Sequence, residues 1–456
     1  MPLSGGVISV LEWLTVTCPL RQSTLCLLIY HTAQDIGFQN CIMPTVIIGA
    51  GIIGVSTAYY LSRSSKADDI HLVEASPQFF ASASGNAAGF LARDWFTSNL
   101  AQLGELSFDL HRQLAEEHNG YERWGYSPSS GSSLEEQVDA GGDWLSEGAS
   151  RSLAAARTAQ GNKNGPSWLK HRDALDVMSD GSSTAQVDPL RLCQFLLDEC
   201  IGRGVRLHQP SRPLSLTRSA SDALSCVNIV GTFTQETLTI PCTELILCVG
   251  AWTAEVYRTL FPESKIQNVP ITSLAGHSLV LQSPHWPPPK LHDTEDNHPL
   301  VRQDCHAVFT TDAEAGYSPE IFSRMPDGHI YLAGLNSSTY PLPKIASERV
   351  IDPKSIAVLR RTAHKLLGDD FEVIREGVCW RPVAKRGVPI ICDLAKKGER
   401  NVYVAAGHGA WGISKQRWFF SPNLVVIKSY ICANRICGSS KILVRYIIHE
   451  TDSYPL

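Results

Sequence analysis

Residues 45–54 read TVIIGAGIIG, a short apolar run that leads directly into the glycine pattern G-x-G-x-x-G. An amphipathic segment from Ile52 to Arg63 follows, and a second apolar run then ends at the acidic residue Glu74. A strand, a glycine loop, a helix and, about 20 positions further on, an acidic residue form the arrangement with which βαβ units bind dinucleotides. A glycine triplet alone is weak evidence, but here all four parts agree. The sequence therefore predicts a dinucleotide-binding site in this segment.

The three glycines are expected to serve different purposes. Gly49 allows the tight turn between strand and helix, Gly51 lets the backbone approach a pyrophosphate because it has no Cβ, and Gly54 lets the helix pack closely on the sheet. The N–H groups at the start of the helix would face the phosphates, and Glu74 would accept hydrogen bonds from a ribose. The contacts predicted in this segment are Gly49, Ala50, Gly51, Ile52, Ile53, Gly54, Glu74 and Ala75.

Composition restricts the class of protein. The chain has 456 residues, enough for two or three domains, and its 43% hydrophobic and 19% charged residues are ordinary for a globular protein. A net charge of −5 without a basic cluster argues against a nucleic-acid surface, and no apolar run reaches the roughly 18–20 residues of a membrane-spanning helix. The 13 cysteines form no C-x-x-C pair and no zinc-like spacing. We therefore expect no metal site, and reduced thiols in a cytoplasmic protein.

Residues 1–42 fit poorly with the segment that follows them. They contain apolar patches but no basic region before those patches and no clear small-residue cleavage site. Met43 lies two residues before the predicted strand, where proteins of this type commonly begin. Residues 1–42 are therefore either a genuine N-terminal extension or upstream sequence included by the choice of start codon. We favour the second interpretation and expect no chemistry from this segment.

Three later segments carry a secondary-structure signal. Leu190 to Cys200 is predicted to be a helix that starts after an Asp-Pro pair, Gly204 to His208 a strand, and Leu245 to Trp252 a buried strand that ends in a glycine and an aromatic residue. Ser127 to Ser133 and Gly141 to Pro166 are rich in Ser, Gly, Ala and Asn. These two segments are predicted to be loops or insertions.

Several short strings occur in one order along the chain. They include ASGNAAG at 83–89, VDP at 187–189, CVGAWT at 248–253 and AAGHGAWGI at 405–413, with FSRMPDGHIYLAG at 322–334 and CWRPVAKRGVPII at 379–391 between them. In this order, over about residues 43–413, the chain resembles the D-amino-acid-oxidase-like FAD-dependent oxidoreductases. That family includes glycine oxidase and sarcosine oxidase, and the chain looks most similar to its fungal members.

The resemblance implies a mixed α/β (α+β) fold. A Rossmann-like FAD-binding domain would be assembled from several chain segments, and a substrate domain would be built on a mixed or antiparallel sheet. The implied boundaries are 43–125, 181–270 and 371–413 for the FAD-binding domain, 126–180 for an insertion or part of the substrate domain, 271–370 for the substrate domain, and 414–456 for an atypical tail.

The resemblance also implies roles for residues beyond the first motif. Small residues after position 83 would bring backbone N–H groups to the flavin, and Pro213-Leu214 would bring an amide to the adenine. Gly407-His408-Gly409 would pass under the pyrimidine edge of the flavin, where N–H groups or a cation stabilise its reduced, anionic form. The implied FAD contacts are Ser84, Asn86, Ala87, Ala88, Gly89, Leu214, Gly250, Trp252, Gly407, Gly412 and Ile413, with His408 as a catalytic residue.

The FAD is expected to be non-covalent. Cys379 and Cys392 are the cysteines of the late part of the matched region, and neither lies in a recognisable attachment context.

Arg381 matches the carboxylate-binding arginine of glycine-oxidase-like relatives and is the second predicted catalytic residue, because a guanidinium can bind a carboxylate through two hydrogen bonds. The chain departs from the family in two places. Ala410 stands where relatives have a second basic residue, and the glycine-rich start of the last helix is replaced after Ile413 by Ser414-Lys415-Gln416-Arg417-Trp418-Phe419-Phe420. We interpret the second change as an altered reading of the 3′ end of the coding sequence, which would weaken flavin binding.

The resemblance therefore implies an FAD-dependent oxidoreductase that oxidises the CH–NH bond of a small amino acid or amine by hydride transfer to flavin. The alternative is a non-catalytic flavin-binding or interaction protein that keeps the fold. An NAD-dependent dehydrogenase would share the glycine motif but does not predict the loop at 84–89 or the late Gly-His-Gly. The sequence leaves open the substrate, the electron acceptor and the oligomeric state.

Overall fold

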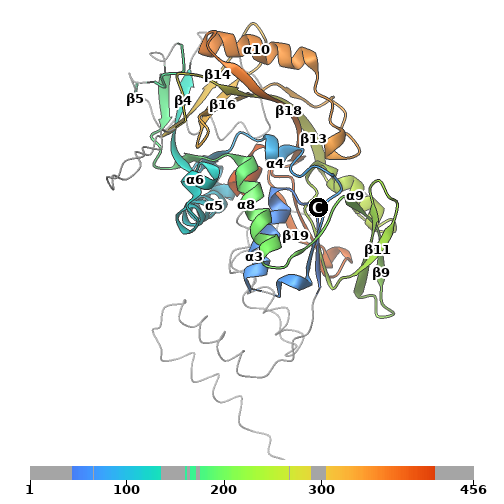
Figure 1. Cartoon of the computed structure of the whole chain (residues 1–456). Coiled ribbons are helices and arrows are strands. Elements are labelled where there is room, and N and C mark those ends of the chain that lie inside the picture. Colours follow the sequence, from blue (N-terminus) through green and yellow to red (C-terminus); the bar gives the residue numbers. More distant parts are fainter. Residues whose placement is uncertain are drawn as a thin grey trace, which may run out of the picture. The chain divides into compact units, whose positions relative to one another are not determined.

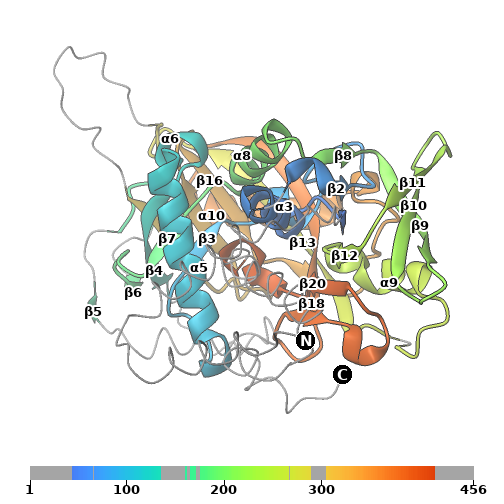
Figure 2. The same ribbon diagram turned by 90° about the horizontal axis from the view of Figure 1, so that it is seen from below.

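The computed structural model describes residues 44–64, 66–134, 160–161, 165–170, 175–266, 268–288 and 304–415. The predicted extension 1–42, most of the segment Gly141 to Pro166 and the tail from residue 416 onward lie outside the described residues. Within the described part of the chain, no helix is long and apolar enough to cross a membrane. The expected mixed α/β class is confirmed, with helices packed on two large sheets (Figures 1 and 2).

The first sheet has six strands in the order β19-β20-β12-β1-β2-β8, and all of them are parallel except β19. Strands β1, β2 and β12 are buried along their whole length, as expected for apolar runs covered on both faces of a parallel sheet. The sheet thus joins the beginning, middle and end of the described chain. Its strands are β1 Thr45–Ile48, β2 Ile70–Val73, β8 Arg206–His208, β12 Glu244–Leu247, β19 Ile390–Asp393 and β20 Val402–Ala406.

Helices α3 (Ile52–Ser64) and α8 (Pro189–Gly202) lie side by side against this sheet (Figures 1 and 2). The side chain of Asp188 begins α8 by accepting a hydrogen bond from the backbone N–H of Arg191 at 3.0 Å, and proline occupies the first helical position. The helices predicted at Ile52 to Arg63 and at Leu190 to Cys200 are confirmed as α3 and α8. The strand predicted from Gly204 to His208 is confirmed as β8. The strand predicted from Leu245 to Trp252 ends earlier, because the chain turns at Gly250 (φ +54°) into a short 3-10 helix.

The second sheet has eleven strands, of which the long antiparallel pair β13 and β18 is the largest part. Helix α10 (Pro353–Leu367) packs Ile356 and Leu359 against Leu279 and Leu281 of β13. The strands are β3 Phe90–Ala92, β4 Ser127–Leu134, β5 Gln160–Gly161, β6 Leu175–Ser179, β7 Thr184–Gln186, β13 Ile271–Gln282, β14 Cys305–Thr310, β15 Glu320–Arg324, β16 His329–Ala333, β17 Asn336–Ser337 and β18 Glu372–Ala384.

The remaining elements surround these sheets. Three antiparallel strands form a small separate sheet: β9 Ser211–Arg218, β10 Leu224–Gly231 and β11 Thr237–Pro241. The other helices are α4 Ala83–Asn86, α5 Ser98–Glu117, α6 Gly120–Trp124, α9 Thr253–Leu260 and α11 Gly412–Lys415, with 3-10 helices η1 Ala67–Asp69, η3 Gly250–Trp252, η4 Ala346–Glu348, η5 Ala395–Lys397 and η6 Gly409–Trp411.

The prediction that Ser127 to Ser133 forms a loop is wrong. These residues form strand β4, which pairs in parallel with β14 and antiparallel with β6. Small polar residues carry a weak strand signal, but packing decides here: a Cβ at Gly131 would lie 2.9 Å from the indole ring of Trp95. Neighbouring strands and a large aromatic side chain therefore select a strand of small residues.

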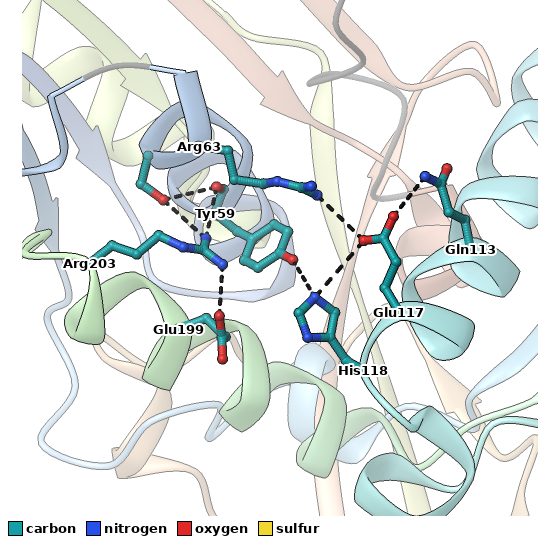
Figure 3. Close-up of polar contacts among 8 residues, drawn as sticks. Tyr59, Arg63, Gln113, Glu117, His118, Glu199 and Arg203 are labelled. Carbon is teal, nitrogen blue, oxygen red and sulfur yellow. Dashed lines mark hydrogen bonds and ion pairs between the residues drawn. The ribbon is translucent and has the colours of Figure 1, made fainter.

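A polar network attaches helix α3 to α5 and α8 (Figure 3). The buried Tyr59 shares a 3.1 Å hydrogen bond with the ring of His118, and the guanidinium of Arg203 lies 4.4 Å from the centre of the Tyr59 ring. Arg203 also donates to the carboxylate of Glu199 at 2.7 Å, while Glu117 pairs with Arg63 at 3.7 Å. The helix whose first turn follows the glycine motif is thus held from two sides.

Replacing Gly54 with alanine is expected to destabilise the fold. An added Cβ would lie 1.8 Å from the carbonyl oxygen of Gly49. Gly49 cannot easily move away, because its backbone N–H donates a 2.8 Å hydrogen bond to the carbonyl of Val73. We expect the free energy of unfolding in urea to fall by about 1–3 kcal/mol. The control is Gly202→Ala at the end of α8, where no heavy atom lies within 4 Å of an added Cβ. Equal stability of the two variants would contradict the predicted clash.

Candidate functional site

A cavity of about 280 Å³ lies where strands β1, β2, β12 and β20 reach their carboxyl ends. This is the edge at which open parallel sheets bind ligands. The cavity continues to strand β18 of the second sheet, so it is lined by residues from both sheets. Three separate stretches contribute to its wall, within residues 48–88, 211–259 and 320–413.

The glycine motif forms one wall of the cavity. Gly49 has a φ of +98°, and a Cβ there would lie 2.6 Å from the carbonyl oxygen of Cys248, so both its conformation and its surroundings require glycine. A Cβ at Gly51 would contact only the side-chain oxygen of Ser84, at 3.1 Å. That hydroxyl also accepts a 2.8 Å hydrogen bond from the N–H of Ile52. The absence of a side chain at Gly51 therefore leaves room in the cavity itself.

Glu74 closes the same wall at the end of β2. Its carboxylate accepts hydrogen bonds from the backbone N–H groups of Ala50 and Ser76, both at 2.9 Å. Burial raises the pKa of this carboxyl group, and the backbone donors oppose that change. The carboxylate is thus fixed between the glycine loop and the strand end, where it can accept a hydrogen bond from a diol.

The small residues after position 83 face the cavity as expected. They begin in helix α4, and Ser84, Asn86, Ala87 and Ala88 line the wall. Gly89 lies just behind them with a φ of +89°, where a Cβ would meet the carbonyl oxygen of Val187 at 2.1 Å. Larger residues at positions 84, 87 or 88 would take up space at the cavity wall, whereas one at Gly89 would collide with the protein behind it.

Arg381 projects from β18 into the cavity wall. Its guanidinium donates a hydrogen bond to the side-chain carbonyl of Asn336 on β17. A Cβ at Gly276 of β13 would lie 3.0 Å from the same guanidinium nitrogen, so glycine makes room for the arginine head group. The cation is therefore held in place by residues of the second sheet.

His408 is buried and lines the cavity, and its Nδ1 has no hydrogen-bond partner among the described residues. Burial, which has the larger effect, and the nearby charge of Lys415 together lower the pKa of the imidazole to about 3. The ring is therefore neutral near pH 7. The roles expected for Gly407-His408-Gly409 at the flavin stay predictions.

Buried contacts hold the end of the described chain, Ile413 to Lys415, in the fold. The ring Nε2–H of His111 donates a 2.9 Å hydrogen bond to the carbonyl oxygen of Ile413, and burial lowers the pKa of His111 to about 4. The hydroxyl of Ser414 lies 3.4 Å from the backbone of Ala92. Lys415 is buried, with its ammonium 4.6 Å from the centre of the Phe96 ring. The first two residues of the predicted tail thus pack into the fold.

Most of the predicted contact residues meet at this cavity. Trp252 lines it and is fixed by a 2.8 Å hydrogen bond from its indole N–H to the carbonyl of Pro343. The predicted residues that line the cavity are Gly49, Gly51, Ile52, Ile53, Glu74, Ala75, Ser84, Asn86, Ala87, Ala88, Gly250, Trp252, Arg381, His408, Gly412 and Ile413. The others, Ala50, Gly54, Gly89, Leu214 and Gly407, do not form its wall.

The prediction for Leu214 concerned its backbone amide, and it stays a prediction. The side chain of Leu214 is 41% exposed, whereas the neighbouring Pro213 lines the cavity.

Sequence reasoning missed several charged residues of the wall. They are Glu320 on β15, Arg212 on β9, Glu255 on α9, and Lys344 in the segment before η4. Glu320 lies two residues before the quoted string FSRMPDGHIYLAG, which is the nearest signal that the sequence offered. Glu255 likewise lies two residues after CVGAWT, and Arg212 directly precedes Pro213-Leu214, whereas Lys344 stands in a segment without any motif.

The residues of the cavity fit FAD. Gly51 leaves space beside the start of α3, Glu74 can receive a ribose, and the small residues 86–88 leave backbone atoms accessible to a flat ring. His408 also lines the cavity, and its buried Nδ1, which has no hydrogen-bond partner among the described residues, is one more polar atom that a ligand could engage. No cluster of three or more metal-binding side chains occurs in the described part of the chain.

Comparison with known proteins agrees with this geometry. A family profile described as FAD dependent oxidoreductase matches residues 45–415. The "Putative oxidoreductase C1F5.03c" of Schizosaccharomyces pombe is 24% identical over 401 residues, covering 81% of this chain and 90% of that protein.

Solved structures show the same fold. Glycine oxidase from Geobacillus kaustophilus superposes with a TM-score of 0.62 at 19% identity, covering 84% of this chain and 93% of the enzyme. Iminodiacetate oxidase from Chelativorans sp. BNC1 gives a TM-score of 0.59 at 19% identity, covering 88% and 97%.

Proposed function

The chain belongs to the FAD-dependent oxidoreductase family, and from that membership we propose that it oxidises the CH–NH bond of a small α-amino acid. FAD would bind non-covalently in the cavity between the glycine motif and β18. The observation that carries the proposal is the position of Arg381, a cation fixed in the wall of the same cavity that the glycine motif lines.

Arg381 would bind the carboxylate of the substrate. Its head group is half-buried, is held by Asn336 and lies over the small residue Gly276. A guanidinium in such a place binds a carboxylate with two parallel hydrogen bonds and so fixes the orientation of the substrate. Similarity to glycine oxidase and iminodiacetate oxidase, whose names refer to carboxylate-bearing amines, supports this substrate class.

Glu320 would bind the amino group of the same substrate. It lines the cavity from β15, which is separated from β13 by β16 alone. Two strand spacings place β13 and β15 roughly 10 Å apart, and the Arg381 head group lies over β13. A small zwitterion would fit between a cation on one side and a carboxylate on the other.

Bound FAD would supply the hydride acceptor. The protein then has to orient the substrate, keep water away and provide hydrogen bonds to the cofactor. Arg381 and Glu320 would orient the substrate, and the buried aromatic side chains near Ala88, among them Phe90 and Phe322, would exclude water. The neutral ring of His408 would provide a hydrogen-bonding group without adding charge.

The second candidate function is a flavin-binding protein without catalysis. It is supported by Ala410, which lines the cavity where glycine-oxidase-like relatives have a second basic residue. With one cation fewer, the site would hold a carboxylate less firmly than theirs. The two functions differ in whether an amino acid reduces the bound flavin.

An absorbance spectrum of the purified protein tests both. We expect the oxidised-flavin bands at about 375 and 450 nm, bleached under nitrogen by at least one amino acid from a panel that includes glycine, sarcosine, proline and the enantiomers of alanine. Flavin bands that no member bleaches, while dithionite does, would support the non-catalytic alternative. After precipitation with trichloroacetic acid the yellow colour should remain in the supernatant, and a yellow pellet would contradict non-covalent binding.

A further inference from the structure

We propose that Arg324 is a positioning residue for the flavin: it turns the peptide N–H groups that follow Ala87 toward the bound cofactor and places a buried positive charge behind them. The proposal rests on the FAD site described above. Arg324 lies at the end of β15 and is separate from the two charged residues assigned to the substrate.

Arg324 is an unusual side chain for its location. It is only 2% exposed, and its guanidinium lies 4.3 Å from the centre of the Tyr331 ring. It donates hydrogen bonds to two successive backbone carbonyls, to that of Ala88 through Nε at 2.9 Å and to that of Ala87 through Nη2. No carboxylate among the described residues comes within ion-pair distance of it. Its partners are therefore peptide groups of the loop that faces the cavity.

Two further side chains hold carbonyls of the same loop. The hydroxyl of Tyr331 donates to the carbonyl of Asn86 at 2.8 Å, and the amide of Gln186 donates to the carbonyl of Ala88 at 2.6 Å. Three successive carbonyls, those of residues 86, 87 and 88, are thus fixed by side chains. Because Arg324 bonds to two of them and also stacks on Tyr331, it is the common element of the arrangement.

Because peptide units are planar, these contacts also fix the direction of the N–H groups of Ala87 and Ala88. In a trans peptide the N–H points opposite to the C=O of the same unit. The N–H of Ala87 therefore points away from the Tyr331 hydroxyl, and the N–H of Ala88 points away from Arg324. Both residues line the cavity, and neither N–H donates to a backbone group outside α4 among the described residues. These two N–H groups are thus directed away from Tyr331 and Arg324 of the second sheet, and we infer that they point toward the cofactor.

The charge of Arg324 adds to this effect. Burial disfavours the charged form and lowers the pKa of the guanidinium, while Asp188 partly opposes this without a direct hydrogen bond. An incompletely paired buried cation gains when a negative charge forms nearby. Reduced flavin is anionic, so a cation behind the loop would stabilise the reduced form more than the oxidised form.

The test uses the full chain loaded with FAD. Arg324→Met removes the charge and the hydrogen bonds at similar volume, and Arg324→Lys keeps the charge without the planar fork. We expect Arg324→Met to weaken FAD binding at least tenfold and to shift the flavin midpoint potential to a more negative value. Arg324→Lys should recover most of the potential but only part of the affinity.

Arg375→Met is the matched control. Arg375 also donates to a carbonyl of this loop, that of Gly85 at 3.2 Å, but the N–H of the same peptide unit, on Asn86, is already bonded to Ser82. Its loss should leave both the affinity and the potential near the wild-type values. Tyr331→Phe removes only the hydroxyl that holds Asn86 and should weaken FAD binding in the same direction, which provides a test if Arg324→Met does not fold.

The outcomes separate this proposal from the proposed function. Wild-type protein that binds no FAD would overturn both. Wild-type protein that binds FAD, together with folded Arg324→Met protein unchanged in affinity and potential, would overturn the role of Arg324 alone. If Arg324→Met does not fold, folded Tyr331→Phe protein with unchanged FAD affinity would overturn it. An equal effect of Arg375→Met would show that any arginine near this segment has this influence, and would likewise overturn it.

Discussion

Replacing Gly51 with valine is expected to abolish FAD binding while the protein stays folded. A side chain at this position would enter the cavity beside the start of α3, where a pyrophosphate has to approach the backbone. Apart from its chain neighbours, the only atom of the described residues within 4 Å of an added Cβ is the side-chain oxygen of Ser84 at 3.1 Å, so a shift of this one side chain relieves the contact. The φ of Gly51 also lies outside the left-handed region.

We expect the dissociation constant for FAD to rise by more than about 100-fold, which corresponds to about 2.7 kcal/mol. Titration of the apoprotein with FAD, followed by flavin fluorescence, measures this value, and circular dichroism reports the fold. Gly202→Val is the control, since that glycine has free space around it and lies away from the cavity. Folded Gly51→Val protein that retains stoichiometric FAD would show that the nucleotide site is placed wrongly.

The second large effect is expected for Arg381→Ala. If Arg381 binds the substrate carboxylate, the variant should lose far more kcat/KM for an amino acid than for the amine that lacks the carboxylate. Truncating one member of a buried charge pair costs on the order of 2–5 kcal/mol, and this corresponds to roughly 30-fold to several thousand-fold in kcat/KM. The amine should lose little, because it makes no bond to the guanidinium.

Two variants sharpen this experiment. Arg381→Lys should recover part of the loss, since an ammonium keeps the charge but not the paired donors of the fork. Arg361→Ala, at an exposed position on α10, controls for the general loss of a positive charge. Equal losses for the amino acid and the amine would make Arg381 a structural residue held by Asn336.

The parts of the fold that the sequence predicted well have local causes. The segment from Thr45 to Glu74 combines apolar strands, glycines and a helix whose signals all agree, and α8 begins where an Asp-Pro pair caps it. The Ser-rich strand β4 was missed because its conformation depends on β6, β14 and the ring of Trp95, all distant in sequence. The composition of a short segment does not indicate which distant residues will pack against it.

The residues of the candidate site also fall into those that the sequence predicted and those that it did not. Glycine and small-residue positions could be predicted because close backbone approach demands them. Glu320 and Arg324 could not, because a charged residue in a strand usually faces solvent and only the register of β15 with β16 turns these two inward. His408 was predicted as a site residue, but its neutral state follows from burial and from Lys415, which the sequence does not reveal.

The order of strands in the first sheet has a consequence for how the protein reaches its native state. β1 near the beginning of the described chain pairs with β12, and β12 pairs with β20, whose residues begin at Val402. During synthesis, the edge of β12 that pairs with β20 therefore remains unpaired until most of the polypeptide has left the ribosome. An apolar, unpaired strand edge can associate with other chains. We expect folding to be slow and governed by long-range pairing, and a chaperone that covers the β12 edge would raise the yield of native protein.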